Sequence, residues 1–374
     1  KQAGGFVAPQ GRTLDRYCVL FRKFGGNPVV LADRDHLKGR REPRLVPWQK
    51  NFVNYVINRV LKTTKPSLAL LNELDHDYEN RALRAFLKKL AQDTDGRKGI
   101  AYPHFYAPPQ NVGLQSGQDL NGNGRTGDAA DAFGFGTFRG QYAMALVSRF
   151  PIETQDAKDF SDVLWKQVPD AQMPKFADGS PFPSYDALHV MRLSSKSHWD
   201  VPIRRPNGQI LHILASHPTP PVFDGPEDMN GKRNRAEILF WDTYIRTQLS
   251  QQTDHFVLLG DLNADPQDGE GSHDAIATLL NSGYLKDPAP TSKGAVHASE
   301  SQASANTRHT NDPAQDTADW RDTPGPGNLR VDYVLPSKTL TIKDAGVFWP
   351  APSEAGFDWI GSDGRASSDH RLVW

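Results

Sequence analysis

The 374-residue sequence contains a single cysteine, Cys18. One cysteine cannot form a disulfide within the chain, and it excludes a zinc site built from several thiolates. A lone cysteine is most often a small buried apolar residue. The fold must therefore depend on an apolar core, and a hydrophobic content of 37% allows one.

The sequence also lacks long apolar runs and an excess of charge of either sign. No stretch approaches the ~18 apolar residues of a membrane-spanning helix. Lysine and arginine number 43 against 44 aspartate and glutamate residues, for a net charge of −1. A broadly basic nucleic-acid binder is thus not the first interpretation, although a local basic groove is compatible with a neutral total. The turn-rich loops, with many Ser, Asn and Asp, favour a secreted or periplasmic location.

Short apolar runs alternate with a few amphipathic segments along the chain, which is the pattern of an α/β protein. Strands are predicted at Leu68–Leu71, Tyr142–Val147, Ile210–Ala215, Phe256–Leu259, Val331–Leu335 and Arg371–Trp374. Helices are predicted at 46–62, around Leu83–Leu90 and at Arg233–Leu249. Long polar segments at 103–140, 151–186 and 286–329 are expected to be functional loops. No linker separates two compositional regimes, so one domain spanning 1–374 is predicted.

Ligand-capable side chains stand at the ends of these predicted strands. They are Glu73, His217, Asp261, Asn263, Asp332, Asp369 and His370. Taken singly, most have a structural alternative: a helix cap for Glu73, a turn for the others, or a core position for His217. Asp332 is harder to dismiss, because an unpaired carboxylate within a strand is costly.

Together these groups supply carboxylates, one carboxamide and two imidazoles, with no thiolate. Carboxylate oxygens suit hard cations such as Mg²⁺, Mn²⁺ or Ca²⁺. Aspartate and histidine side chains supply a general base and an oriented acid. A metal ion, a base and a cationic imidazole are the groups needed for phosphoester hydrolysis. No glycine motif of the dinucleotide or P-loop type is present, so organic cofactors are not expected.

Six motifs, in this order, resemble those of the endonuclease/exonuclease/phosphatase superfamily. They are Leu-Asn-Glu at 71–73, Ser-Arg-Phe-Pro at 148–151, Ser-His-Pro at 216–218, Gly-Asp-Leu-Asn-Ala-Asp at 260–265, Val-Asp-Tyr-Val-Leu at 331–335 and Ser-Asp-His at 368–370. The resemblance covers about residues 45–374 and looks nearest to a secreted bacterial branch. It implies a four-layer α/β sandwich, in which two packed, mostly antiparallel sheets are flanked by helices.

The resemblance also implies a role for each of these residues. Glu73 and Asp369 would bind the catalytic divalent ion, Mg²⁺ or Mn²⁺, with Ca²⁺ as a further candidate. Asp261 would position or deprotonate the attacking water, and Asn263 would hold that water or the phosphate. His217 and His370 would stabilise charge or protonate the leaving oxygen, and Asp332 would orient a histidine. Arg149 and Asn111 are candidates for contacting the substrate, with a bracing role as the alternative for Arg149.

One departure concerns the first strand, at 17–24. Members of the superfamily usually carry an asparagine metal ligand at its end, but here the nearest asparagine is Asn27. Either Asn27 substitutes for that ligand or the ligand is missing.

A second cation site is predicted in the loop that begins at Asp119. Oxygen-bearing residues recur there at alternate positions and are followed by Gly124, as in calcium-binding loops, although position 12 is Ala130. The candidate structural calcium ligands are Asp119, Asn121, Asn123, Arg125, Asp128 and Asp131. The alternative is a plain Asn/Gly turn.

The sequence thus predicts a secreted, metal-dependent phosphoesterase, a phosphatase or phosphodiesterase that attacks small phosphoesters in line with water. The first alternative is a sugar-non-specific, metal-dependent endonuclease with nucleic acid as its substrate. Basic residues between Arg12 and Arg44 could serve such an enzyme, but clusters of this kind are usually solvated surface. The second alternative is a binding protein that has kept the scaffold and lost the chemistry.

Overall fold

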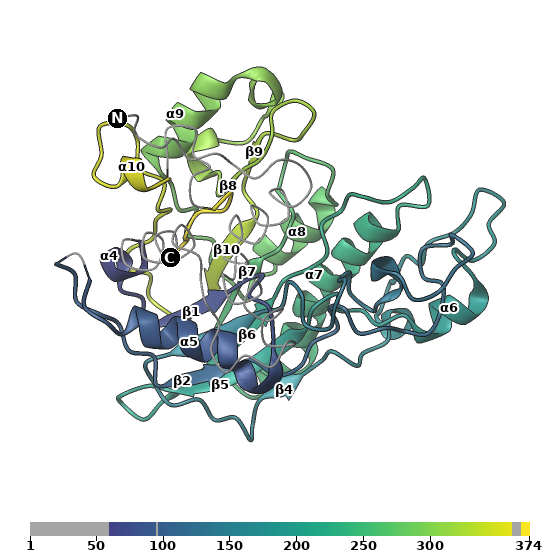
Figure 1. Cartoon of the computed structure of the whole chain (residues 1–374), viewed down its shortest axis with the longest axis horizontal. Helices are drawn as coiled ribbons and strands as arrows, with labels where there is room; N and C mark the ends of the chain where they lie inside the picture. Colours follow the sequence, from purple (N-terminus) through teal and green to yellow (C-terminus); the bar gives the residue numbers. More distant parts are fainter. Residues whose placement is uncertain (1–59, 95, 361–367) are drawn as a thin grey trace, which may run out of the picture.

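Two β-sheets pack against each other at the centre of the molecule (Figure 1). The computed structural model describes residues 60–94, 96–360 and 368–374. The first sheet has the order β1-β3-β2, with β1 at Leu68–Leu71, β2 at His104–Tyr106 and β3 at Ala145–Ser148. The second has the order β10-β7-β6-β5-β4, with β4 at Lys158–Asp159, β5 at His198–Arg204, β6 at Ile210–Ser216, β7 at Phe256–Asp261 and β10 at Asp332–Pro336.

Alternation of side chains along the strands explains how the sheets meet. Successive residues of a strand point to opposite faces of its sheet. In β3, Leu146 therefore packs toward the second sheet, whereas Val147 faces away from it. Trp199 of β5 is fully buried between the sheets, and its ring meets that of Tyr106 edge-on at 5.2 Å. The central core of the protein lies in this layer.

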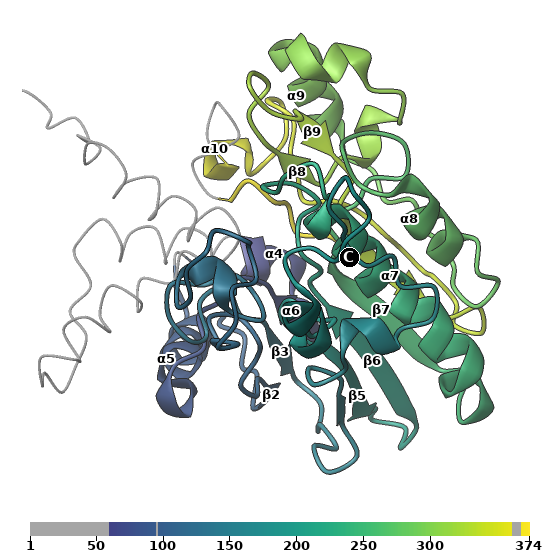
Figure 2. The same ribbon diagram turned by 90° about the vertical axis from the view of Figure 1, so that its right-hand side faces the viewer.

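Helices cover the outer face of each sheet, as Figure 2 shows from left to right. Helix α5, Arg81–Leu90, buries its leucines against the first sheet. Helices α7, Met229–Thr247, and α8, His273–Leu280, cover the second sheet. Strands β6 and β7 are parallel, so α7 is the crossover that joins them, whereas every other strand pair is antiparallel. The predicted four-layer α/β sandwich is confirmed.

The three turn-rich segments contain short elements of their own. The first holds β2 and the 3-10 helix η3 at Ala129–Asp131; the second holds β4, η4 at Trp165–Gln167 and the start of α6 at Tyr185–Val190. The third holds α9 at Lys293–Gln302, η6 at Ser304–Arg308, η7 at Pro313–Gln315, β8 at Ala318–Asp319 and β9 at Asn328–Leu329. The remaining helices are α4 at Lys62–Thr64, η2 at Tyr78–Asn80, η5 at Leu249–Gln251 and α10 at Phe357–Ile360.

The structure corrects one predicted element and leaves two others undecided. Residues Arg371–Trp374 do not form a strand, because Val373 makes only an isolated bridge with Val347. The predicted strand at 17–24 and helix residues 46–59 lie outside the described residues. No helix among the described residues has the length and apolar character needed to cross a membrane.

Candidate active site

Strand register brings three of the predicted residues together. Asp332 of β10 lies directly opposite Asp261 of β7 in their antiparallel pair. In the parallel pair of β6 and β7, Ala215 lies opposite Leu259, so His217 comes level with Asp261 two residues later. The Nε2 atom of His217 lies 3.3 Å from Oδ2 of Asp261, and both side chains are buried. The second sheet therefore fixes this group.

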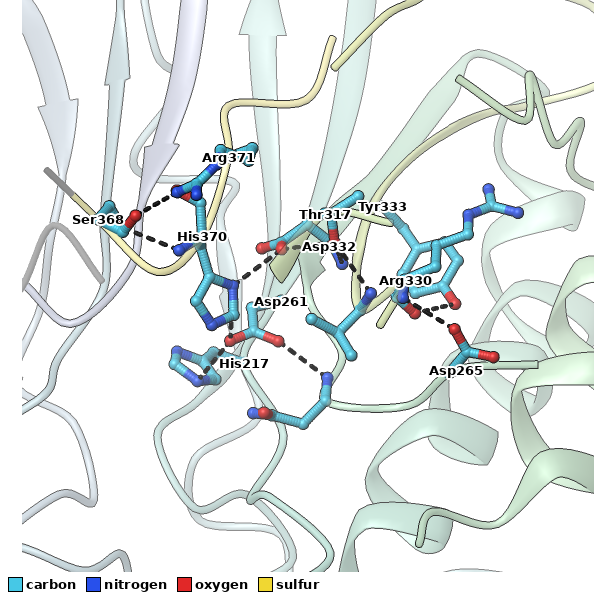
Figure 3. Close-up of polar contacts among 12 residues, drawn as sticks. His217, Asp261, Asp265, Thr317, Arg330, Asp332, Tyr333, Ser368, His370 and Arg371 are labelled. Carbon is cyan, nitrogen blue, oxygen red and sulfur yellow. Dashed lines mark hydrogen bonds and ion pairs between the residues drawn. The ribbon is translucent and has the colours of Figure 1, made fainter. Parts of the chain in front are cut away.

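His370 joins the group from the C-terminal segment (Figure 3). Its Nδ1 atom lies 2.8 Å from Oδ2 of Asp332 and 3.8 Å from Oδ2 of Asp261. The hydroxyl of Thr317 donates a hydrogen bond of 2.9 Å to the same Asp332 oxygen. It also accepts hydrogen bonds from the backbone amides of Val331 and Asp332. Asp332 thus holds the His370 ring, and Thr317 holds Asp332.

The surroundings of His370 favour the charged form of its ring. Burial lowers the pKa of His370, but the negative charges of Asp332 and Asp261 outweigh it and raise this pKa to about 9. The ring is therefore an imidazolium at neutral pH. Its Nε2 atom is buried and has no hydrogen-bond partner among the described residues, so this N–H can bind a reacting group.

Two residues beside this group have unusual backbone conformations. Glu73, after β1, has φ 55°, and Asn263, after β7, has φ 50°. Non-glycine residues rarely occupy this left-handed region, and such strain often occurs at functional sites. The backbone amide of Asn263 donates a hydrogen bond of 2.9 Å to Oδ1 of Asp261. Its side-chain Nδ2 donates one of 3.0 Å to the carbonyl of Pro218.

A cavity of about 1420 Å³ lies next to this group: Asn263, Val331 and Asp369 line it, whereas His217, Asp261, Asp332 and His370 are not among its lining residues. Glu73 lines it as well. The first and third turn-rich segments, and Phe182 from the second, supply much of its wall, with the segment after β6 on another side. Wall residues from these parts include Asn121, Phe135, Phe182, Pro221, Phe223, Arg308 and Trp320. The long segments thus form much of the cavity wall, and their functional role stays a prediction.

The carboxylates that line the cavity fit a hard divalent cation. Glu73 and Asp369 are nearly buried, and oxygen donors of this kind suit Mg²⁺ or Mn²⁺. Asp261, Asp332 and His370 form a second possible set, with ligand atoms within 4.8 Å of one another. In that set the Nδ1 atom of His370 is already bonded to Asp332, so a cation there would displace this hydrogen bond. Glu73 and Asp369 stay the predicted ligands, and Asp261, Asp332 and His370 are the alternative set.

The structure argues against two predicted substrate contacts. Arg149 follows the C-terminal end of β3, and that end pairs with Leu68 at the start of β1. Glu73 follows the opposite end of β1. Arg149 therefore lies at the opposite edge of the sheet from the cavity. Asn111 is fully buried, and its amide group donates to the carbonyls of Ser161 and Ser194 and accepts from Arg192. Asn111 therefore braces loops and has no group left for a substrate.

The predicted calcium loop folds into a tight set of turns. The Asp119 carboxylate accepts hydrogen bonds from the backbone amides of Gly122 and Gly124. The side-chain amides of Asn121 and Asn123 donate to the carboxylate of Asp128. Arg125 donates its backbone amide to Asn123 Oδ1. Asp131 joins this cluster through Asp128: its buried carboxylate accepts the backbone amides of Leu120 and Asp128. Asp128 is the N-cap of η3 and Asp131 completes its capping box, so both carboxylates already accept backbone amides, and a calcium site here stays a prediction.

One supporting residue was missed by the sequence analysis. Arg371 forms a fully buried ion pair of 3.1 Å with Asp319 and donates a hydrogen bond to the carbonyl of Ser368. Its guanidinium also lies over the ring of Trp349, 4.4 Å from the centroid. This pair holds the turn that carries Asp369 and His370. The only sequence signal was an arginine beside the Asp-His motif.

A sequence-family model described as the Endonuclease/Exonuclease/phosphatase family matches residues 53–370. The chain belongs to this family. Its members are divalent-metal-dependent hydrolases of phosphoester bonds, so the predicted enzyme class is confirmed at that level. No curated protein sequence matches the chain.

Solved structures with a similar fold include three from different organisms. An endonuclease/exonuclease/phosphatase from Beutenbergia cavernae is 17% identical, with a TM-score of 0.48, over 86% of this chain and 64% of that one. The human Nocturnin catalytic domain with bound sulfate is 13% identical, with a TM-score of 0.44, over 84% and 81%. A variant of Staphylococcus aureus beta toxin with bound magnesium ions is 14% identical, with a TM-score of 0.43, over 87% and 91%. The chain spans less than two thirds of the Beutenbergia cavernae protein.

Proposed function

We propose that this protein is a metal-dependent phosphatase or phosphodiesterase that hydrolyses small phosphoesters. The observation that carries the proposal is the imidazolium of His370. It is oriented by Asp332, and its Nε2 is buried without a partner among the described residues. It stands beside Asp261 and next in sequence to Asp369, which lines the cavity with Glu73. Secretion stays a prediction from composition.

The residues divide the proton transfers between them. Asp261 accepts the proton of the attacking water, and His217, at 3.3 Å from its carboxylate, stabilises the charge of the site. His370 donates its Nε2 proton to the leaving oxygen, since an imidazolium is an acid at neutral pH. Asn263 orients the water or a phosphate oxygen. A divalent ion held by Glu73 and Asp369 would supply Lewis-acid stabilisation of charge on the phosphoryl oxygens.

The charges around the cavity favour a small substrate over nucleic acid. A groove that follows a nucleic-acid backbone is lined by lysine and arginine. Here the outer wall carries Arg308 and Arg321, but also Asp224, Glu227 and Glu270. The endonuclease alternative is therefore second, and salt-dependent DNA cleavage would favour it. The non-catalytic binding protein is third, since the acid and histidine groups of a hydrolase are all present.

The test is metal-restored hydrolysis. The purified protein is stripped with chelator and assayed on a chromogenic phosphate monoester, a chromogenic diester and plasmid DNA, with Mg²⁺, Mn²⁺ or Ca²⁺ restored singly. Asp261→Asn, prepared in parallel, controls for contaminating enzymes. Ester cleavage that needs metal and is lost in Asp261→Asn supports the proposal. DNA nicking that falls with salt promotes the endonuclease, and silence on every substrate favours a binding protein.

A further inference from the structure

We propose that Phe135 and Phe223 form an apolar subsite of the cavity and bind an alkyl or aryl substituent of the phosphoester substrate. Both rings line the cavity together with Glu73 and Asp369, the predicted metal ligands. The inference rests on the proposed function, because it concerns the substrate of the same site. It names the chemical class of that substrate, a phosphoester that carries an apolar group.

Both rings are large, apolar and exposed to solvent. Phe223 is 91% exposed and Phe135 is 58% exposed. Six large hydrophobic side chains in the described part of the chain are exposed, and these two are the ones among them that line the cavity. Contact between such rings and an apolar ligand removes apolar surface of both from water, which favours binding. The two rings therefore mark one part of the cavity as a site for an apolar group.

Hydrogen bonds from α7 anchor the backbone on both sides of Phe223. The side-chain amide of Asn230 donates to the carbonyl of Val222 at 2.7 Å, and the backbone amide of Asn230 donates to the carboxylate of Asp224. Phe223 itself has φ 72°, in the left-handed region that non-glycine residues rarely adopt and that often marks functional sites. The exposure of this ring is therefore built into the fold by an anchored backbone.

The backbone around Phe135 is anchored in a similar way. Gly134 donates its amide to the carbonyl of Asn111 at 3.1 Å, and Gly136 donates its amide to the carbonyl of Ala129 at 3.2 Å. The residues on both sides of the ring are thus bonded to other parts of the first turn-rich segment. A second phenylalanine on an anchored backbone therefore lines the same cavity, although the two rings come from segments far apart in the chain.

An apolar strip joins Phe223 to the catalytic group. His217 is followed by Pro218, whose carbonyl binds the Asn263 side chain. Every residue from 219 to 223 lines the cavity, and four of these five are apolar. A substituent of a phosphoryl group held beside Asn263 can therefore extend along this strip to the Phe223 ring. At about 1420 Å³ the cavity has room for both parts, since ligand pockets usually have volumes of about 300–1,000 Å³.

The charges at the outer end of the strip favour a neutral group. The wall continues beyond Phe223 with Asp224 and Glu227, whose negative charges disfavour a second anionic group there. A further phosphate or a nucleic-acid backbone would meet these carboxylates, whereas an alkyl or aryl group carries no charge. Aryl groups can also pack edge-on or offset against the phenylalanine rings. A neutral apolar substituent therefore fits this end of the cavity best.

The test measures the binding of alkylphosphonates to the metal-loaded full chain by isothermal titration calorimetry. Methyl-, butyl- and octylphosphonate share one anionic head group, lack an ester bond and differ only in the length of the apolar tail. For the wild type, Kd should fall about 2- to 4-fold with each added methylene, as expected when a CH₂ group is partly to fully buried. Inhibition constants against the chromogenic ester that the wild type cleaves should follow the same order.

The variants are Phe135→Ala, Phe223→Ala and the double variant, with Tyr185→Ala as the matched control. Tyr185, at the start of α6, is 66% exposed and is not among the residues that line the cavity. Each single phenylalanine variant should bind octylphosphonate about 10-fold more weakly and lose much less affinity for methylphosphonate. Phe223→Leu should recover part of the loss, and Tyr185→Ala should bind both ligands as the wild type does. Circular dichroism checks that the variants fold.

The outcomes separate this inference from the proposed function. A Kd that does not change with tail length in the wild type would overturn the subsite, and so would a dependence that the double variant leaves unchanged. Loss of binding to phosphatidylcholine vesicles in the double variant, without any dependence on tail length, would assign the rings to a membrane surface instead. Failure of the proposed function is a different result: no ester is hydrolysed with any ion, whereas the calorimetry needs no turnover.

Discussion

Replacing Asp332 by Asn should leave the fold intact and impair the acid of the reaction. The hydroxyl of Thr317 accepts two backbone amides, so its own proton must go to Oδ2 of Asp332. The carbonyl oxygen of an asparagine can take the place of Oδ2 and still accept from both Thr317 and His370. What the substitution removes is the negative charge 2.8 Å from Nδ1 of His370.

The size of the effect follows from the pKa of His370. Burial lowers this pKa, yet Asp332, the first of the raising charges, and Asp261 bring it from 6.5 to about 9. At about 1.4 kcal/mol per pKa unit the net rise amounts to roughly 3 kcal/mol. Removing the largest raising contribution should take away more than about 1 kcal/mol, a downward shift of at least about one pKa unit. Asp→Asn at a comparable histidine partner lowers kcat by about 10⁴.

The assay is the pH dependence of kcat/KM at fixed saturating metal, in wild type and Asp332→Asn. The alkaline limb of the profile should move to lower pH in the variant, and kcat at neutral pH should fall by about 10² or more. Circular dichroism and the melting temperature check that the fold is kept. An alkaline limb that does not move, with the rate merely scaled down, would refute His370 as the acid.

Three further predictions concern stability. In chelator, unfolding measured by denaturant should show a contribution from His370 that is complete below about pH 6.5 and lost as the pH rises toward 9, because its pKa is raised in the folded state. The total loss is at most about 3 kcal/mol. Arg371→Met leaves the buried carboxylate of Asp319 without its cation, so the same titration should show a loss of about 3–5 kcal/mol, and a loss below about 1 kcal/mol would contradict the bracing role. If the 119–128 loop binds Ca²⁺, calcium at about 100 times its dissociation constant should stabilise the wild type by about 2.7 kcal/mol, and Asp128→Asn should reduce this gain.

The apolar runs of the sequence were sufficient to predict most of the central strands. The predicted strand Leu68–Leu71 is found with the same bounds. The observed bounds of β6, β7 and β10 differ by no more than two residues at either end from the strands predicted to begin at 210, 256 and 331. Strand β5 was missed, although Trp199, Val201 and Ile203 alternate toward the other sheet. Pro202 obscures that pattern, because proline is normally excluded from the interior of a sheet.

The site was predictable where strand ends and motifs placed it. Asp261 and Asp332 could be predicted from the sequence, because a carboxylate in or at the end of a buried strand has few positions it can occupy. Arg149 was misplaced because its motif does not say which end of an antiparallel strand faces the cavity. Thr317 was missed because it acts on Asp332, 15 residues away in the chain. Contacts of that kind are set by packing and leave no local pattern.

The buried carboxylates give a last prediction, whose readout does not depend on turnover. Glu73 and Asp369 are 6% and 7% exposed and line one cavity, and they are the proposed ligands of the divalent ion. Glu73→Gln removes one charge of the pair and keeps the volume of the side chain. The melting temperature of this variant in chelator is the reference against which its response to metal is measured.

With metal restored, the two proteins should respond differently. Binding to the folded state alone stabilises a protein by about 2.7 kcal/mol at 100 times the dissociation constant. The wild type should gain this amount with Mg²⁺ or Mn²⁺, whereas Glu73→Gln should gain little. Asp131→Asn, which alters a buried carboxylate away from this pair, is the matched control and should keep the full metal-induced gain. If Glu73→Gln responds to the ion as the wild type does, Glu73 is not a ligand, and the set formed by Asp261, Asp332 and His370 becomes the better candidate.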